Sequence, residues 1–310
     1  MNGINRCAGI NVTASRFQFV EVEKVSDQLF ITNLGQTFIS PSINFEVQNE
    51  TELLGQLQTA FDEINIQNPV NSSIVSFTLP PELFITIQLP YDNNLTQAEI
   101  TEEFRWEISQ LFPFLAADEL AIKFYDLSKE IFPGNYNALV VALNKKYLLL
   151  LKNFCTKNKL SPRLVDNASI TANAFINTYS QAQDSITVNI YNSKNSITFF
   201  INISSKPAYV KVFQKTTNDF SNSIVKILSE EKIKKIFTKS VKFAFFSGDD
   251  IGTELQSEFR QVSGLEFIKF NPFKIVKFKT DLHSAGISGE QYSTFTSATG
   301  IAARFNKTNT

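Results

Sequence analysis

The sequence predicts an α/β protein of two lobes, with an α+β subdomain inserted beside the first lobe. Three observations lead to this prediction. Two segments, residues 9–22 and 185–200, each read as a buried strand, a short polar turn and a second apolar strand. Residues 84–158 read as strand, helix, strand, strand and helix, which is typical of a small α+β sandwich. With 310 residues the chain is too long for one simple core.

The bulk composition excludes several classes of protein. The chain is 43% hydrophobic, which indicates an ordinary globular protein rather than a disordered one. A net charge of −1 gives no reason to expect a nucleic acid or an anionic membrane as the main partner. Two distant cysteines, no signal-like N-terminus and no run near ~18 apolar residues favour a soluble, cytoplasmic protein without its own membrane span.

The first lobe begins with alternating strand and turn signals. Apolar residues at helical spacing then predict a helix that Asn49 or Thr51 can cap. A turn signal at residues 33–35 is expected to end the second strand. The predicted elements are strands at Phe17–Val25, Leu29–Leu34, Ile43–Val47 and Ile74–Leu79, and a helix at Thr51–Asn65.

The inserted subdomain follows two prolines. Thr96 and Glu99 form a capping box, which predicts the start of a helix that Pro113 ends. The other predicted elements are strands at Phe84–Leu89, Leu120–Leu127 and Tyr136–Leu143, and a helix at Lys145–Asn158.

The second half of the chain is predicted to contain further strands, the second hairpin and four helices. A strand at Val241–Phe246, apolar except for Lys242, is followed by Ser247-Gly248-Asp249-Asp250, which places a turn at the carboxyl edge of a sheet, where ligands bind in α/β folds. Strands are predicted at Arg163–Asp166, 186–203 (the hairpin), Tyr209–Phe213, Val241–Phe246 and Phe267–Phe270, helices at Ser169–Ser180, Phe220–Thr238, Thr253–Val262 and Phe295–Phe305, and a loop at Ser284–Gly289.

The two hairpins have the outline of the phosphate-binding hairpins of the actin-like (ribonuclease H-like) ATPase fold. The expected domains are a first lobe (1–82), the inserted subdomain (83–162), a crossover helix returning to the first lobe (163–182), a second lobe (183–292) and a C-terminal helix (293–310).

Taken in order, the motifs resemble the PilM family, the actin-like proteins of bacterial type IV pilus assembly. The most specific is an Arg-Trp-Glu helix that ends in an apolar-Pro-Phe corner, residues 102–114 after Leu89-Pro90. Four further segments are similar to segments of the family, namely Leu164-Val165-Asp166, Phe245-Phe246-Ser247-Gly248, Asn271-Pro272-Phe273 and Ala298-Thr299-Gly300-Ile301-Ala302. The resemblance implies ATP in a cleft between the lobes and contact with the short cytoplasmic tail of a membrane partner, PilN, and other platform proteins.

The turns that would hold phosphate depart from that pattern. Asn11 and Asn189 stand where the acids would be, and Thr13 and Tyr191 where the glycines would be. Metal binding needs a carboxylate, and close approach of backbone amides to phosphate needs glycine. A vestigial nucleotide cleft of Asn11, Thr13, Ser15, Asn189, Ser193, Ser247 and Gly248 is therefore expected, with no catalysis and no required cofactor, although weak binding of Mg-ATP stays open.

The sequence lacks the residues that other kinds of catalysis or metal binding would need. His283 is the only histidine, so the chain has no complete set of ligands for a zinc site and no complete set of side chains for a catalytic triad. Trp106 is either a packing residue or an anchor for a partner, a role in which Trp is enriched. A partner groove is expected between the first lobe and the inserted subdomain, lined from residues 9–47 and 84–160.

These expectations combine into one hypothesis, a cytoplasmic adaptor of a type IV pilus platform that reaches the inner membrane through a PilN-like partner. The alternatives are an ATP-binding or ATP-hydrolysing actin-like protein, a cytoplasmic module of a type II secretion platform, and a protein that polymerises like actin.

Overall fold

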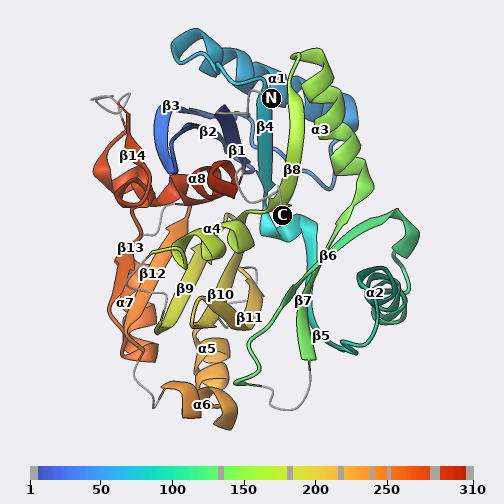
Figure 1. Ribbon diagram of the computed structural model, residues 1–310, viewed down its shortest axis with the longest axis vertical. Helices are drawn as coiled ribbons and strands as arrows, with labels where there is room; N and C mark the ends of the chain where they lie inside the picture. Colours follow the sequence, from blue (N-terminus) through green and yellow to red (C-terminus); the bar gives the residue numbers. More distant parts are fainter. Residues whose placement is uncertain are drawn as a thin grey trace.

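The computed structural model describes residues 6–131, 136–179, 184–215, 220–237, 241–249, 253–279 and 287–304. Within them, strands form three sheets, two of which make the upper and lower lobes in Figure 1 while the third lies beside them. This arrangement confirms the predicted α/β class with two lobes. The predicted domain boundaries themselves stay predictions.

The first sheet has six strands. Its first three strands in sequence form an antiparallel meander. Two further strands pair parallel beyond the first strand of the meander, and a short strand from the C-terminal part pairs parallel with the third. In spatial order the strands are β14 (Lys277–Phe278), β3 (Gln28–Phe38), β2 (Arg16–Val25), β1 (Arg6–Val12), β4 (Ile74–Leu79) and β8 (Ser161–Asn167).

The second sheet repeats this pattern with five strands. An antiparallel meander is again followed by two parallel strands. In spatial order they are β11 (Lys206–Gln214), β10 (Ser196–Ile203), β9 (Ile186–Asn192), β12 (Phe243–Gly248) and β13 (Phe267–Lys269). Each lobe therefore begins with a hairpin, as the sequence predicted, and the first strand of each hairpin also pairs with a parallel strand.

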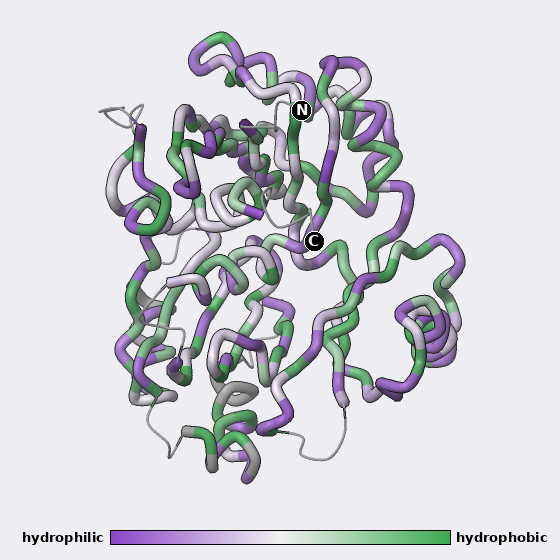
Figure 2. The backbone as a smooth tube through the Cα atoms, viewed as in Figure 1, coloured by the Kyte–Doolittle hydropathy of each residue, from purple (hydrophilic) through white to green (hydrophobic). Residues whose placement is uncertain are grey.

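The inserted subdomain is a three-stranded antiparallel sheet covered by one helix. The strands are β5 (Phe84–Tyr91), β7 (Tyr136–Asn144) and β6 (Leu120–Asp126), with β7 in the middle. Helix α2 (Gln97–Leu111) buries Ile100, Phe104 and Ile108 on this sheet. The coil of α2 is largely purple in Figure 2, because its other faces carry polar and acidic residues.

The remaining helices cover the two main sheets. They are α1 (Glu50–Gln67), α3 (Lys145–Lys157), α4 (Ala168–Ile176), α5 (Phe220–Ser229), α6 (Glu231–Phe237), α7 (Thr253–Ser263) and α8 (Thr296–Ala303). Short 3₁₀ turns include η1 (Pro81–Leu83), η2 (Ala117–Glu119), η4 (Pro272–Lys274) and η5 (Gly289–Phe295). Local sequence explains where two helices begin, since Asn49 with Glu52 and Thr96 with Glu99 form complete capping boxes.

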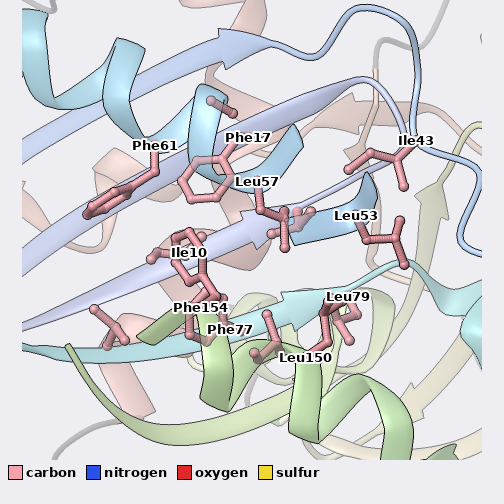
Figure 3. Close-up of a cluster of buried hydrophobic side chains, with 14 of the residues drawn as sticks. Ile10, Phe17, Ile43, Leu53, Leu57, Phe61, Phe77, Leu79, Leu150 and Phe154 are labelled. Atoms are coloured by element: carbon pink, nitrogen blue, oxygen red, sulfur yellow. The ribbon is translucent and has the colours of Figure 1, made fainter. Parts of the chain in front are cut away.

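The core of the first lobe lies between its sheet and helices α1 and α3. Phe17 from β2, Phe61 from α1, Phe77 from β4 and Phe154 from α3 converge there, as Figure 3 shows, and all four rings are nearly or fully buried. Their centroids lie 5.4–6.4 Å apart in the pairs that touch, mostly edge to face, which is the favoured geometry for aromatic rings.

Two small-residue helices fill the space between the lobes. Helix α8 packs on β1 and β2 of the first sheet, helix α4 contacts β9 of the second, and the two helices pack against each other (Figure 1). Their close packing relies on glycine. A Cβ on Gly9 would collide with the backbone oxygen of Ala298, and one on Gly300 would lie 3.0 Å from the backbone oxygen of Thr171.

Replacing Gly9 by alanine is expected to lower the free energy of unfolding by roughly 1–3 kcal/mol, because α8 must shift away from the sheet. Urea unfolding followed by circular dichroism measures this. The matched control is Gly55→Ala on α1, where a Cβ meets nothing within 4 Å and helix propensity favours alanine by about 1 kcal/mol. Equal changes at both positions would contradict the packing argument.

Three predicted elements were wrong. Ile43–Val47 is a loop and turn, not a strand; Ile43 and Phe45 are buried because they anchor this loop on the core. The turn expected at residues 33–35 is absent, and β3 runs on to Phe38. Gly35 there faces Phe19, whose ring leaves no room for a side chain, so the glycine serves packing rather than a turn.

The single helix predicted at Phe220–Thr238 is two helices, α5 and α6, broken at Glu230. At the end of α5 the Ser229 hydroxyl donates to the carbonyl of Lys226 at 2.7 Å, a local bond that competes with continuing the helix. Parts of other predictions lie outside the described residues, namely Ser180, Thr238, Asp250, His283, residues 284–286 of the expected loop, and residues 305–310 of the expected C-terminal helix.

Candidate functional site

The backbone amides of the first hairpin turn form hydrogen bonds within the turn itself. Thr13 follows β1, and its N–H donates to the carbonyl of Arg16 at 2.9 Å to close the turn. The Thr13 hydroxyl oxygen accepts from the backbone N–H groups of Ser15 and Arg16 at 3.3 and 3.0 Å. These two amides, which in a phosphate-binding turn would face the ligand, are therefore bonded to a side chain of the turn.

Asn11 lies at the end of β1 in a chain of neutral hydrogen bonds. Its Oδ1 accepts from the hydroxyl of Thr78 on β4 at 2.8 Å, and its Nδ2 donates to Gln18 on β2 at 3.1 Å. Gln18 in turn donates to Thr294 at 2.8 Å. Asn11 is 2% exposed, so both ends of its amide are used inside the protein. This arrangement supplies no negative charge for a metal ion.

The second hairpin closes in the same way as the first, because the Ser193 N–H donates to the carbonyl of Ser196 at 2.9 Å. The last paired residues before the two turns are Val12 and Asn192. Counting back from them, Tyr191 matches Asn11 in position, whereas Asn189 lies two residues farther from its turn. The expectation that Asn11 and Asn189 hold equivalent positions was therefore wrong, because β9 is longer on the turn side than the spacing of the two asparagines suggested.

Asn189 belongs to a buried cluster of four asparagines. Its Nδ2 donates to Asn173 at 2.8 Å, and Asn173 and Asn202 exchange hydrogen bonds at 2.9 and 3.0 Å. Asn177 joins by donating to Asn202 at 3.0 Å. These bonds connect α4 to β9 and β10, so Asn189 holds the interlobe helix on the second sheet.

Tyr191 fills the space beside the interlobe helices. The residue is 3% exposed and packs with Ala168 and Ala172 of α4. Burial raises the pKa of Tyr191 strongly, against a smaller lowering by its hydrogen bond to Ser297 on α8, so the ring stays neutral. Tyr191 therefore stands at the position that matches Asn11, where the pattern of a phosphate turn expects an acid. The expectation that Tyr191 takes the place of a glycine was wrong, because Ser193 is the residue that matches Thr13.

The third predicted turn packs on the second hairpin. Gly248 has φ of +96°, and a Cβ there would collide with the carbonyl of Asn192. The N–H of Asp249 donates to that same carbonyl at 2.7 Å, and Ser247 is 1% exposed. Gly248 is therefore needed for this close contact between β12 and β9.

A cavity of about 390 Å³ lies where the second hairpin turn faces the first lobe. Ala14 and the loop 42–46 form one side, Pro80, Glu82 and Leu83 the next, and Ser193, Lys194 and Asn195 the other. Ser15 is adjacent to Ala14 at the first turn. Glu46 and Glu82 bring carboxylates to this wall, which disfavours a triphosphate.

Asp166 at the end of β8 is the centre of a network that the sequence reasoning did not identify as a site. It accepts from Arg304 at the end of α8 and, at 2.8 Å, from the hydroxyl of Tyr125 on β6. Lys123 lies 3.5 Å away, and Asp166 is 4% exposed. Burial raises the pKa of Tyr125 strongly, with the Asp166 charge adding to it. The only advance signal was the Leu164-Val165-Asp166 motif.

Trp106 lies apart from the cleft, on α2 of the inserted subdomain, with 61% of its surface exposed. Leu111, the last residue of the same helix, and Phe114, which follows the helix, are also exposed. Trp106 is therefore not part of the subdomain core. Its role as an anchor for a partner stays a prediction.

Neither thiol is placed for chemistry, because burial raises the pKa of Cys7 to about 11 and that of Cys155 to about 12. Among the residues that the structure describes, no three His, Cys, Asp or Glu side chains are grouped to hold a metal ion. The helices described in these ranges are all too short or too polar to cross a bilayer.

Two lobes of repeated topology, each opening with a hairpin beside the cleft and joined by paired central helices, define an actin-like fold. The model of the family described as "Type IV pilus assembly protein PilM" matches residues 9–222, more than half of the chain. The chain therefore belongs to the PilM family, which confirms the resemblance drawn from its motifs.

Solved structures support the fold. A PilM-PilN type IV pilus biogenesis complex is similar with a TM-score of 0.70 and 16% identity, over 96% of this chain and 98% of that one. A Bacteroides thetaiotaomicron protein with an actin-like ATPase fold and unknown function has a TM-score of 0.54 and 11% identity, over 87% and 95% of the two chains. A search of curated protein sequences finds no match.

Proposed function

We propose that this protein is a non-catalytic adaptor of a type IV pilus assembly platform that binds the cytoplasmic tail of a PilN-like membrane protein. Membership of the PilM family supports the place in pilus assembly. The similar structure described as a PilM-PilN complex supports the kind of partner. Location in the cytoplasm beside the inner membrane follows from that partner and is part of the proposal.

The single observation that carries the non-catalytic role is that the chain's own side chains take up the hydrogen-bonding groups and part of the space at the two hairpin turns. The Thr13 hydroxyl occupies amides of the first turn, and Tyr191 takes the space beside the second. Phosphate binding needs free backbone amides, and hydrolysis needs a metal-binding carboxylate at Asn11. A protein with this cleft acts through contacts with other proteins.

For the tail we propose the region between the first sheet and the inserted subdomain. Among the described strands, β8 is the last of the first sheet and β6 is an outer strand of the inserted one. The contacts of Lys123 and Tyr125 with Asp166 place these two strands next to each other. An outer strand exposes unpaired backbone groups, to which an extended peptide adds as a further strand.

Loop 42–46, from the N-terminal part of the expected groove, lines the 390 Å³ cavity, but its opposite wall is the turn of the second hairpin rather than residues 84–160. That cavity is therefore a poorer candidate for the tail than the β8 edge. The groove between first lobe and inserted subdomain stays a prediction.

Calorimetric titration with a synthetic peptide of the partner's cytoplasmic tail tests the proposal. We expect saturable binding that is unchanged by millimolar Mg-ATP, and no heat from Mg-ATP alone. Lys123→Ala should weaken peptide binding several-fold, because Lys123 borders the β8 edge and is half exposed. Lys211→Ala, an exposed lysine on the outer strand of the second sheet, is the matched control.

Tight Mg-ATP binding, or peptide binding that requires it, would overturn the non-catalytic role in favour of a nucleotide-switched protein. Absence of peptide binding would overturn the proposal that the partner is a PilN-like tail. Trp106, the sole tryptophan, offers a second readout: a fluorescence change on peptide addition would show that α2 also faces the tail.

A further inference from the structure

Glu82 connects the first lobe to the turn of the second hairpin. It lies in η1, directly after β4, and its Oε1 accepts from the Ser193 hydroxyl at 2.5 Å. The same oxygen accepts from the backbone N–H of Asn195 at 3.1 Å. One carboxylate oxygen thus binds a hydroxyl and a backbone amide of a turn more than a hundred residues away in sequence.

These donors are of the kind that a phosphate-binding turn offers. Backbone N–H groups of a tight turn and a neighbouring hydroxyl form a small concave site for anions. In the first hairpin the equivalent amides are bonded by the Thr13 hydroxyl, within the turn itself. In the second, the corresponding residue, Ser193, points its hydroxyl at Glu82 instead, and the anion comes from the opposite lobe.

The surroundings of Glu82 contain the amine of Lys215 and leave one carboxylate oxygen without a partner in the described part of the chain. The Nζ of Lys215 donates to the carbonyl of Ser193 at 2.5 Å, which places a cation beside the turn. Burial lowers the pKa of Lys215, and the charges of Asp249 and Glu82 act in the opposite direction. The second carboxylate oxygen of Glu82 is buried and has no hydrogen-bond partner among the described residues.

We infer that the carboxylate of Glu82 is a built-in substitute for phosphate at the β9–β10 turn and holds the two lobes together without nucleotide. Where a ligand phosphate bridges two lobes, the relative position of the lobes depends on whether the ligand is bound. Where a side chain of the protein makes the same bridge, the lobes stay connected without any ligand. This inference concerns the cleft and does not depend on which tail or platform protein is bound.

The test uses Glu82→Ala and Glu82→Gln in the full chain. Glu82→Ala is expected to lower the melting temperature and to speed hydrogen exchange in the peptide that contains Asn195. Glu82→Gln, which keeps an acceptor oxygen but not the charge, should fall between Glu82→Ala and the parent. It also keeps the test valid if the alanine variant does not fold.

Inorganic phosphate is the probe for the vacated site. Added phosphate should raise the melting temperature of Glu82→Ala more than that of the parent, because the Asn195 amide and the Ser193 hydroxyl become free. The matched control is Glu46→Ala, which removes an exposed carboxylate from the same cavity with the same change in charge. Unchanged exchange at Asn195 in both Glu82 variants, or an equal phosphate effect in Glu46→Ala, would overturn the inference.

Discussion

Replacing Phe154 by alanine is expected to lower the free energy of unfolding by roughly 3–5 kcal/mol, the range for removing a large buried aromatic side chain. Phe154 is 1% exposed and its ring contacts those of Phe17, Phe61 and Phe77, at 6.4, 5.4 and 6.1 Å between centroids. These rings come from β2, α1 and β4 (Figure 3). Because four elements meet at this one side chain, the surrounding chain can close only part of the cavity.

Urea unfolding gives the size of the loss, and the m-value shows whether the native state stays compact. Leu149→Ala is the control on the same helix, since 52% of Leu149 is exposed. The control should change stability by only about 0.5 kcal/mol. A similar loss at both positions would mean that the helix, rather than the aromatic cluster, determines the stability of this lobe.

The second large effect is expected at Asp166. Its replacement by alanine leaves Arg304 and Lys123 without their common carboxylate and the partly buried Tyr125 hydroxyl without an acceptor. Removing one partner of a buried ion pair costs about 3–5 kcal/mol. Because the Arg304 side chain is 24% exposed and water can solvate it in part, we expect the lower end, about 3 kcal/mol.

Thermal and urea unfolding measure this loss, and hydrogen exchange in residues 120–126 reports whether the inserted subdomain loosens. Asp166→Asn retains an acceptor and should lose less than Asp166→Ala. Asp118→Ala removes an exposed carboxylate from the inserted subdomain and serves as control. If Asp166→Ala costs no more than Asp118→Ala, the network does not connect the subdomain to the first lobe.

Local signals predicted most elements of the fold. The capping box of Thr96 and Glu99 lies within one helical turn, so it could be recognised from spacing alone, whereas Asn49 was one of two candidate caps and the structure shows that it forms a capping box with Glu52. Predictions failed where distant packing decided the local structure. Gly35 looked like a turn residue but faces the ring of Phe19, and Ile43–Val47, with apolar residues at alternate positions, looked like a strand but is a loop anchored on the core.

The candidate site was predictable only in part. The two hairpins could be found because a strand, a polar turn and a strand are adjacent in sequence. Their relative register could not be found this way, which is why Asn189 was matched with Asn11 when Tyr191 holds that position. Glu82 carried no signal, since its partners Ser193 and Asn195 lie more than a hundred residues away.

The sequence by itself determined the α/β class, the two hairpins, the inserted subdomain and the absence of acidic and glycine residues from residues 11–16 and 191–196, because each is written in neighbouring residues and their periodicity. Only the tertiary structure decided which side chains occupy the space around these turns. Tyr191, the asparagines of α4 and β10, and the carboxylate of Glu82 fill or bridge the space between the lobes, and the carboxylate of Asp166 connects the first lobe to the inserted subdomain. Such contacts depend on how sheets and helices distant in sequence approach one another, and no local pattern records that distance.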